Sequence, residues 1–160
     1  MFNIGDKVIH RQEGACTIKG LVDMNVEHES KQYYLLEPLT DLKTSIYVSA
    51  DADKQKNIRH TIKPNDLKTA QEEIKESPME WVDNPKQRNQ SLTKLITSMN
   101  FKEVLSSWDC LSTRKLHNKL NPRDVQLLKV AQKLVFSEVA MIMDVKYEEI
   151  EARPKTFMSL

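Results

Sequence analysis

Glycine is scarce in this chain, which has three glycines in 160 residues, at positions 5, 14 and 20. After residue 20 there is no glycine to let the backbone approach a phosphate closely, so this region has no glycine-rich phosphate loop. The Ser, His and Asp residues form neither a nucleophile-elbow pattern nor a metal-binding pattern. We therefore expect that the protein is not an enzyme and has no catalytic residues and no small-molecule substrate.

Cysteine is nearly absent as well, since Cys16 and Cys110 are the only two and lie far apart in the sequence. Widely separated cysteines favour reduced thiols in a cytosolic protein. The cysteines and histidines never approach the paired spacing of a zinc site, and the histidines are His10, His28, His60 and His117. We expect neither a structural metal nor a cofactor.

Long apolar runs are missing too. No stretch approaches the eighteen or so apolar residues that a membrane span needs, although 39% of residues are hydrophobic, which is enough for a core. The first residues, Met1 to Ile4, do not resemble a signal peptide. The sequence therefore predicts a cytoplasmic protein without membrane association.

The net charge of +1 hides an uneven distribution. Residues 1–66 contain nine Lys or Arg against ten Asp or Glu, whereas residues 84–133 contain ten against three. Such a basic excess suits a polyanionic partner, although a solvated helical surface would have the same composition. Charge alone does not separate these two interpretations.

The N-terminal part has the pattern of short strands, because each glycine lies beside a run of β-branched residues. Alternating polar and apolar residues predict strands over residues 7–10, 15–24, 31–37, 45–48 and 57–61. Five short antiparallel strands suggest a small, half-open barrel of Tudor or SH3-like type. Such a sheet leaves edge strands, which can pair with a strand of another protein.

The remainder of the chain predicts helices. Pro64 opens a helix to about residue 76, residues 77–85 form a break containing Trp81, and Pro85 begins the second helix. Asn100 and Asn121 precede the third and fourth helices, and the fourth has a broad apolar face. Residues 147–151 add a short turn. The predicted class is α+β, with an antiparallel β domain over residues 1–63, a C-terminal helical bundle over 64–153 and an unstructured tail over 154–160.

Several short motifs resemble a known family. Gly5-Asp6-Lys7-Val8, Glu13-Gly14-Ala15 and Tyr33-Tyr34-Leu35-Leu36 resemble the RNA polymerase interaction domain of CarD-type bacterial transcription regulators, which transcription-repair coupling factors also contain. Leu120-Asn121-Pro122-Arg123-Asp124, followed later by Glu138-Val139-Ala140, looks like the long helix of the CarD C-terminal domain. The resemblance covers most of the chain, through the order of its motifs.

This resemblance implies two partners. In the family, the N-terminal domain binds the RNA polymerase β subunit, and the C-terminal domain touches promoter DNA at the upstream edge of the transcription bubble, where a tryptophan wedges into the minor groove and prolongs the open complex. Trp81 matches that tryptophan by its place between two helices. The positions that match the polymerase contacts are Met24, Asn25 and Tyr47. The candidates for largely sequence-independent phosphate contact are Lys86, Arg88, Arg114, Lys115, Lys119 and Arg123.

Alternatives remain open at this point. Trp81 could be a structural anchor, as most buried tryptophans are, although it belongs to no apolar stripe and is expected to be displayed. Trp108 lies in phase with the apolar residues of its helix and is expected in the core. Met24 and Tyr47 could be ordinary sheet residues. The chain as a whole could be a protein-interaction adaptor that uses its β domain without direct DNA contact.

Overall fold

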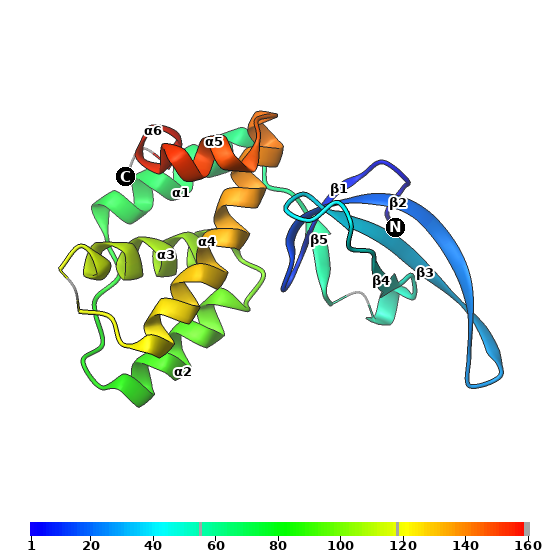
Figure 1. Cartoon of the computed structure of the whole chain (residues 1–160), viewed down its shortest axis with the longest axis horizontal. Helices are drawn as coiled ribbons and strands as arrows, with labels where there is room; N and C mark the ends of the chain where they lie inside the picture. The colour runs from blue at the N-terminus through cyan, green and yellow to red at the C-terminus, as the bar shows by residue number, and fades with distance from the viewer. Residues whose placement is uncertain (55, 118, 159–160) are drawn as a thin grey trace. The chain divides into compact units, whose positions relative to one another are not determined.

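The computed structural model describes residues 1–54, 56–117 and 119–158. The chain forms two compact units, Met1–Thr61 and Ile62–Leu160. The described strands all belong to the first unit and the α-helices to the second, as Figure 1 shows. The predicted α+β class, with an antiparallel sheet followed by helices, is therefore confirmed.

The first unit is built on one antiparallel sheet with the strand order β4-β3-β2-β1-β5. A short 3-10 helix, Ala52–Lys54, connects β4 to β5. Every strand predicted from the sequence is present, although β2 and β3 are longer than expected. The strands are β1 (Lys7–His10), β2 (Gly14–Val26), β3 (Glu29–Pro38), β4 (Ile46–Ser49) and β5 (Ile58–His60).

Alternation along the strands gives this sheet one buried face. Tyr34 and Leu36 of β3 point into a core that also receives Ile18 of β2. Phe2 packs against this core, and its ring meets the Tyr34 ring edge-on, with centroids 5.9 Å apart. The buried residues of the core are Val8, Cys16, Ile18, Tyr34, Leu36, Val48 and Ile58.

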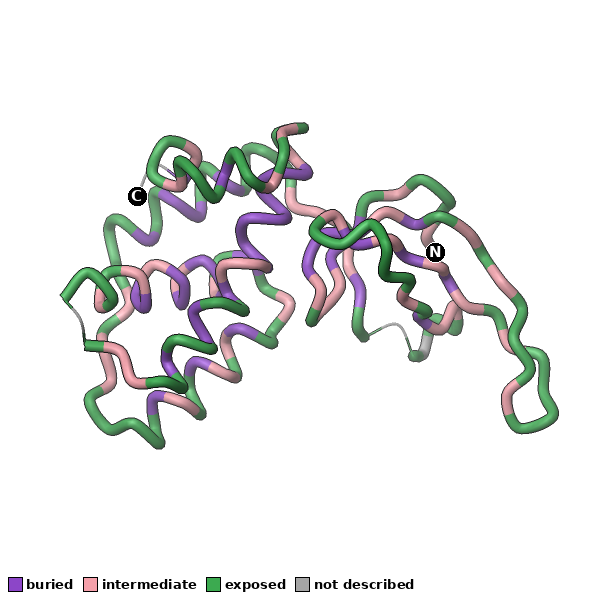
Figure 2. The backbone as a smooth tube through the Cα atoms, in the orientation of Figure 1, coloured by how far each residue is buried: buried purple, intermediate pink, exposed green. Residues whose placement is uncertain are grey.

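The β2–β3 hairpin extends beyond this core and is largely exposed toward its turn (Figure 2). Glu27 and His28 form the turn with positive φ values of 53° and 68°, the backbone of a tight hairpin connection. A bulge between Ile18 and Gly20 shifts the register of β2 against β3, and such bulges increase the bend of a strand. Because residues 21–30 are exposed or only partly buried, this end of the hairpin has no hydrophobic core of its own.

The second unit begins its helices where the sequence predicted. Pro64, Pro85 and Pro122 occupy the first helical turns, where the missing proline N–H is not needed. Asn100 caps the third helix by accepting a hydrogen bond from the Glu103 N–H at 3.2 Å. The helices are α1 (Pro64–Glu76), α2 (Pro85–Ile96), α3 (Phe101–Lys115), α4 (Pro122–Met143), α5 (Tyr147–Ala152) and α6 (Pro154–Met158).

Helix α4 is the centre of this unit and contacts α1, α2, α3 and α5. Its broad apolar face is buried accordingly, as Figure 2 shows. Trp108 of α3 is 8% exposed and meets Phe136 of α4 edge-on at 5.3 Å between centroids, so its predicted place in the core is confirmed. Among the residues that the structure describes, no helix combines the length and apolar character that a membrane crossing needs.

The prediction of an unstructured tail over residues 154–160 is wrong for residues 154–158, which form α6, and residues 159–160 lie outside the described residues. Met158 is fully buried, and the Gln71 side-chain amide of α1 donates a hydrogen bond to the Phe157 carbonyl at 3.3 Å. The buried side chain and the long-range hydrogen bond tie this short segment to the rest of the helical unit. Its sequence is too short to show a helical period.

Candidate functional site

Trp81 lies in the extended segment of residues 77–84 between α1 and α2, and its side chain is partly buried. Two guanidinium groups lie over its ring, with the central carbon of Arg88 4.3 Å and that of Arg114 4.8 Å from the ring centroid. The ring also borders a small cavity with Leu92 and Cys110. The prediction that Trp81 is displayed and unpacked is therefore wrong in this respect, because arginines of α2 and α3 stack on it.

Arg88 is only 6% exposed, although the sequence analysis placed it among the phosphate-contacting residues. Its Nε and Nη2 donate to the two carboxylate oxygens of Asp124, at 3.0 and 2.9 Å. Its Nη1 donates to the carbonyl oxygens of Val82 and Asp83, both at 3.0 Å. The assignment of Arg88 to DNA contact is wrong, because burial and these four hydrogen bonds occupy its guanidinium.

Asp124 is 2% exposed and joins two helices. Besides Arg88, its carboxylate accepts the backbone N–H of Asn121 at 3.2 Å, and its own N–H donates to the Asn121 side chain at 2.8 Å. This capping box places the carboxylate at the positive end of α4, where a negative charge is favourable. Asp124 therefore links the start of α4 to α2.

Sequence reasoning missed the Arg88–Asp124 pair, although one signal was present. Arg88 precedes Leu92 by one helical turn and Ile96 by two, so it lies on the buried face of α2. Asp124 has the same relationship to the buried Leu128 on α4. A charged residue in phase with an apolar stripe indicates a buried partner of opposite charge.

The structure brings most of the other predicted basic residues to the same end of the helical unit. The last turn of α3 contains Arg114, which is partly buried, and the first turn of α4 contains Arg123, which is exposed. Lys86 is exposed in the first turn of α2, which the Arg88–Asp124 pair holds against the start of α4. Lys115 and Lys119 are exposed, at the end of α3 and after it, and Lys115 also borders a cavity lined by residues of α5 and α6. We call the set Lys86, Arg114, Lys115, Lys119 and Arg123 the basic end.

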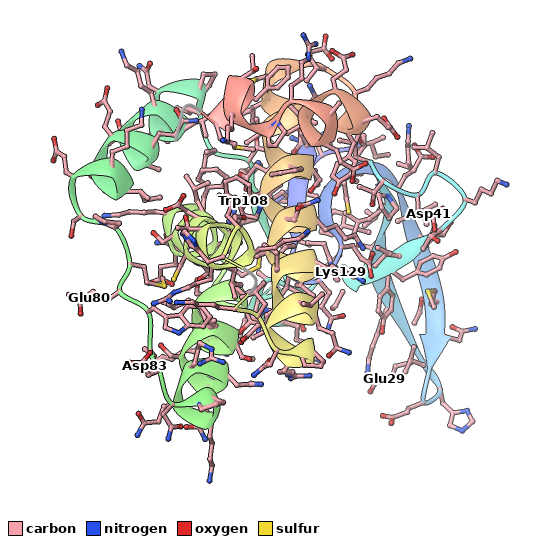
Figure 3. All side chains as sticks on the ribbon, turned by 60° about the vertical axis from the view of Figure 1, so that its left-hand side comes forward. Glu29, Asp41, Glu80, Asp83, Trp108 and Lys129 are labelled. Carbon is pink, nitrogen blue, oxygen red and sulfur yellow. The ribbon has the colours of Figure 1, made fainter. Side chains whose placement is uncertain are left out.

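The Trp81 segment itself has the opposite charge. Glu80 and Asp83 are exposed, and Figure 3 shows them along the segment, with the Glu80 side chain directed away from the helices. Any phosphate close to Trp81 must therefore be contacted by the helices and not by the segment.

The polymerase-contact residues predicted in the first unit divide between the two faces of the sheet. Tyr47 pairs with Leu35 and is 51% exposed, whereas Met24 pairs with Lys31 and is 36% exposed. Leu35 and Lys31 alternate with the buried residues of β3, so Tyr47 and Met24 lie on the face opposite the core. Asn25, the next residue after Met24, points to the other side.

One sheet edge is partly open. β4 is an edge strand, and it pairs with β3 only from Tyr33 to Leu36. Residues 29–31 of β3 extend past β4 and have no strand partner on that side in the described part of the chain. A strand with free backbone groups of this kind can accept a strand from another protein.

Neither unit presents a metal centre within the described ranges, where no three His, Cys, Asp or Glu residues gather. The thiols of Cys16 and Cys110 are both buried, one in each unit. Burial raises the pKa of the Cys110 thiol above its usual value, which lowers its reactivity.

Comparison with known proteins identifies the first unit. Residues 2–62 match the family model of the CarD-like/TRCF RID domain. This range coincides with the β unit and ends before α1. No curated protein matches the chain.

Proposed function

Because residues 2–62 form a CarD-like RNA polymerase interaction domain, we propose that the chain binds the β subunit of RNA polymerase and, through its helical unit, promoter DNA at the upstream edge of the bubble. The domain match supports a transcription-related protein that interacts with RNA polymerase. DNA contact and stabilisation of the open complex are the further parts of the proposal. They are supported above all by the position of Trp81 at the basic end.

Two features of the β unit suit polymerase docking. The open edge of β3 and β4 offers backbone hydrogen bonds to an incoming strand, which do not depend on particular side chains. The face with Tyr47 and Met24 adds exposed apolar area beside that edge. Tyrosine and methionine are enriched in protein interfaces, because both bury a large apolar area. Asn25 lies on the opposite face and is not part of this contact.

The helical unit suits a weak, sequence-independent contact with DNA. Lysine and arginine side chains from α2, α3 and α4 converge at the basic end, although the three segments are far apart in the sequence. Such contacts bind phosphates and release counterions, with little dependence on base sequence. A tryptophan in their midst can insert at an unstacked base step and favour the opened duplex.

Arg114 has to move for Trp81 to act as a wedge. Its guanidinium lies over the ring, so a base can stack there only after the guanidinium leaves. A phosphate group offers this arginine a stronger, charge-assisted partner than the ring does. In this proposal, DNA binding exchanges the Arg114–Trp81 contact for an Arg114–phosphate contact, while Arg88 stays over the ring.

An adaptor without DNA contact is the second candidate. It is favoured by the partial burial of Trp81 and by the exposed carboxylates of Glu80 and Asp83 beside it. In that case the basic end would meet an acidic protein surface, and the β unit alone would provide recruitment to polymerase.

A fluorescence anisotropy titration separates the two candidates. A forked, partly melted promoter fragment is titrated with the full chain, and a fully paired fragment of the same length is the control. The proposal expects tighter binding to the forked fragment and loss of this preference in Trp81→Ala. Equal binding to both fragments would argue against a wedge, and no binding at low salt would favour the adaptor.

A further inference from the structure

Arg88 and Asp124 are placed where they can fix the position of Trp81, and we infer that they act as a clamp for this residue. The ion pair connects α2, α4 and the Trp81 segment at one point. Its consequence at promoters depends on the proposed DNA contact, whereas its effect on Trp81 in the free protein does not. Arg88 is a positioning residue in this inference and makes no contact with DNA.

The geometry of Arg88 fixes the segment in three ways. Two parallel hydrogen bonds to Asp124 hold the guanidinium plane relative to α4. Two further bonds from Nη1 hold the carbonyl groups of Val82 and Asp83, the two residues that follow Trp81. The same guanidinium lies over the indole ring at 4.3 Å. Backbone and side chain are therefore held by one group.

The segment has few other means of staying in place. It lacks regular secondary structure from Ser77 to Asn84, and apart from Trp81 and Val82 its residues 80–84 are exposed. Without the clamp, the ring would keep its contact to Arg114 and its place at the small cavity that Leu92 lines. A wedge must meet DNA at a defined position, so that a contact held loosely would stabilise the open complex less.

Stability alone does not account for this pair. A buried ion pair can often be replaced by apolar residues of similar volume without loss of stability, because both charges must be desolvated. Apolar replacements cannot bind the carbonyl groups of Val82 and Asp83, nor stack a cation on the ring. Beyond its packing, Arg88 therefore serves to hold Trp81 in a fixed position.

The test uses the full chain labelled with 5-fluorotryptophan, which gives one ¹⁹F signal each for Trp81 and Trp108, and Trp81→Phe identifies the first. The main variant combines Arg88→Met with Asp124→Leu, and Arg88→Lys is measured beside it. We expect cooperative melting of both variants with an unchanged Trp108 signal, whereas the Trp81 signal shifts toward that of the unfolded chain. A Trp81 signal that stays at its wild-type position in both variants would overturn the inference.

A matched control removes an ion pair elsewhere in the helical unit. Lys102 of α3 and Glu73 of α1 form a pair that is about half exposed, and Lys102→Met with Glu73→Leu should leave the Trp81 signal unchanged. If the double variant does not melt cooperatively, Arg88→Lys decides by the same signal, since it keeps the charge and loses the bidentate geometry.

The promoter measurement tests the link to function separately. The lifetime of the open complex with the Arg88→Met and Asp124→Leu variant should fall to the level of Trp81→Ala. A wild-type lifetime in this variant, together with a shortened one in Trp81→Ala, would overturn the clamp. If Trp81→Ala itself had a normal lifetime, the proposed function would fail, whereas the ¹⁹F signal would still decide whether the clamp exists.

Discussion

The guanidinium carbon of Arg114 lies 4.8 Å from the centroid of the Trp81 ring. This contact joins the last turn of α3 to the segment before α2. Arg114 therefore has two possible partners, the Trp81 ring and a DNA phosphate, and it cannot contact both at the same time. The guanidinium covers the ring in the free protein, and it is one of the cations of the basic end. Replacing it should therefore change the exposure of Trp81 and the affinity for DNA in separable ways.

We expect Arg114→Ala to make Trp81 more accessible to acrylamide, because one of the two groups over the ring is removed. Affinity for the forked fragment should fall, and the slope of log affinity against log salt should decrease by about 0.9 for one lost phosphate contact. Arg114→Lys should restore the slope, since it keeps the charge. A slope that is unchanged in Arg114→Ala would show that this side chain does not contact phosphate.

Trp81→Ala should cost an intermediate amount of stability. Substitution of an exposed residue usually changes the free energy of unfolding by about 0.5 kcal/mol, whereas truncation of a buried aromatic residue to alanine lowers it by about 3 to 5 kcal/mol. Trp81 is half-buried and has two cation–π contacts of about 0.5 to 1 kcal/mol each, so we expect a loss of about 1 to 2 kcal/mol in chemical denaturation. Trp108→Ala, at a buried position, is the control and should lose more stability than Trp81→Ala.

The same Trp81→Ala variant should shorten the lifetime of the open complex while polymerase binding remains unchanged. Stacking on an unpaired base is worth about 1 to 3 kcal/mol, which corresponds to roughly a five- to hundredfold change. Trp81→Phe, which keeps a ring, should retain part of the lifetime. Equal lifetimes of the wild type and Trp81→Ala on several promoters would contradict the wedge.

Local sequence signals predicted most of the helical unit. Pro64, Pro85 and Pro122 begin helices as expected, because a fixed φ suits the first turn, and the side chains of Asn84 and Asn121 cap the helices at Pro85 and Pro122. The strands were also predicted, with errors at the ends of the β2–β3 hairpin, where no core residue marks the boundary. These elements depend on neighbours within a few residues, which a single sequence shows directly.

The site was less predictable, because its contacts are distant in sequence. Arg88 and Asp124 are 36 residues apart, and a basic residue in a basic stretch is ordinarily a solvated cation. Only the packing of α2 against α4 turns Arg88 inward. The sequence also does not reveal that arginines cover Trp81, since it suggested a displayed ring from the absence of an apolar stripe. The cluster of basic residues, in contrast, was found from composition alone.

The salt dependence should identify the members of the basic end one at a time. Alanine substitution of each exposed cation should weaken binding to forked and paired fragments alike, and should lower the salt slope by about 0.9 for a residue in contact with phosphate. The positions to test are Lys86, Lys115, Lys119 and Arg123. Lys68→Ala, on the exposed face of α1, is the matched control and should change neither quantity.

The stability of the helical unit should depend on the ionisation of Asp109. Burial raises the pKa of this carboxyl above its usual value, so the native state holds the proton more tightly than the unfolded chain does. The contribution of Asp109 to the stability of the fold is therefore most favourable below the pKa of about 3.9 in the unfolded chain, and it is lost as the pH rises through the pKa in the native state. We expect Asp109→Asn to gain stability relative to wild type as the pH rises from about 3 to 7, measured by urea denaturation.

The two faces of the β unit allow a test of polymerase docking that contains its own control. Tyr47 is 51% exposed on the face opposite the core, whereas Asn25 points to the other side. Tyr47→Ala removes an exposed aromatic ring and should leave the fold intact, since surface changes usually cost about 0.5 kcal/mol or less. If the ring is an anchor of the interface, its loss should weaken binding to the β subunit by about tenfold or more.

Asn25→Ala should bind the β subunit as the wild type does, and Met24→Ala should show a smaller loss than Tyr47→Ala, because its side chain is less exposed. The measurement is biolayer interferometry of the full-length variants against an immobilised β subunit lobe. Pairing by backbone alone predicts a different result, in which all three variants bind equally and Ser30→Pro abolishes binding, since the Ser30 N–H points to the open edge of β3 and proline removes this donor. A loss confined to Asn25→Ala would place the interface on the opposite face of the sheet and contradict both modes.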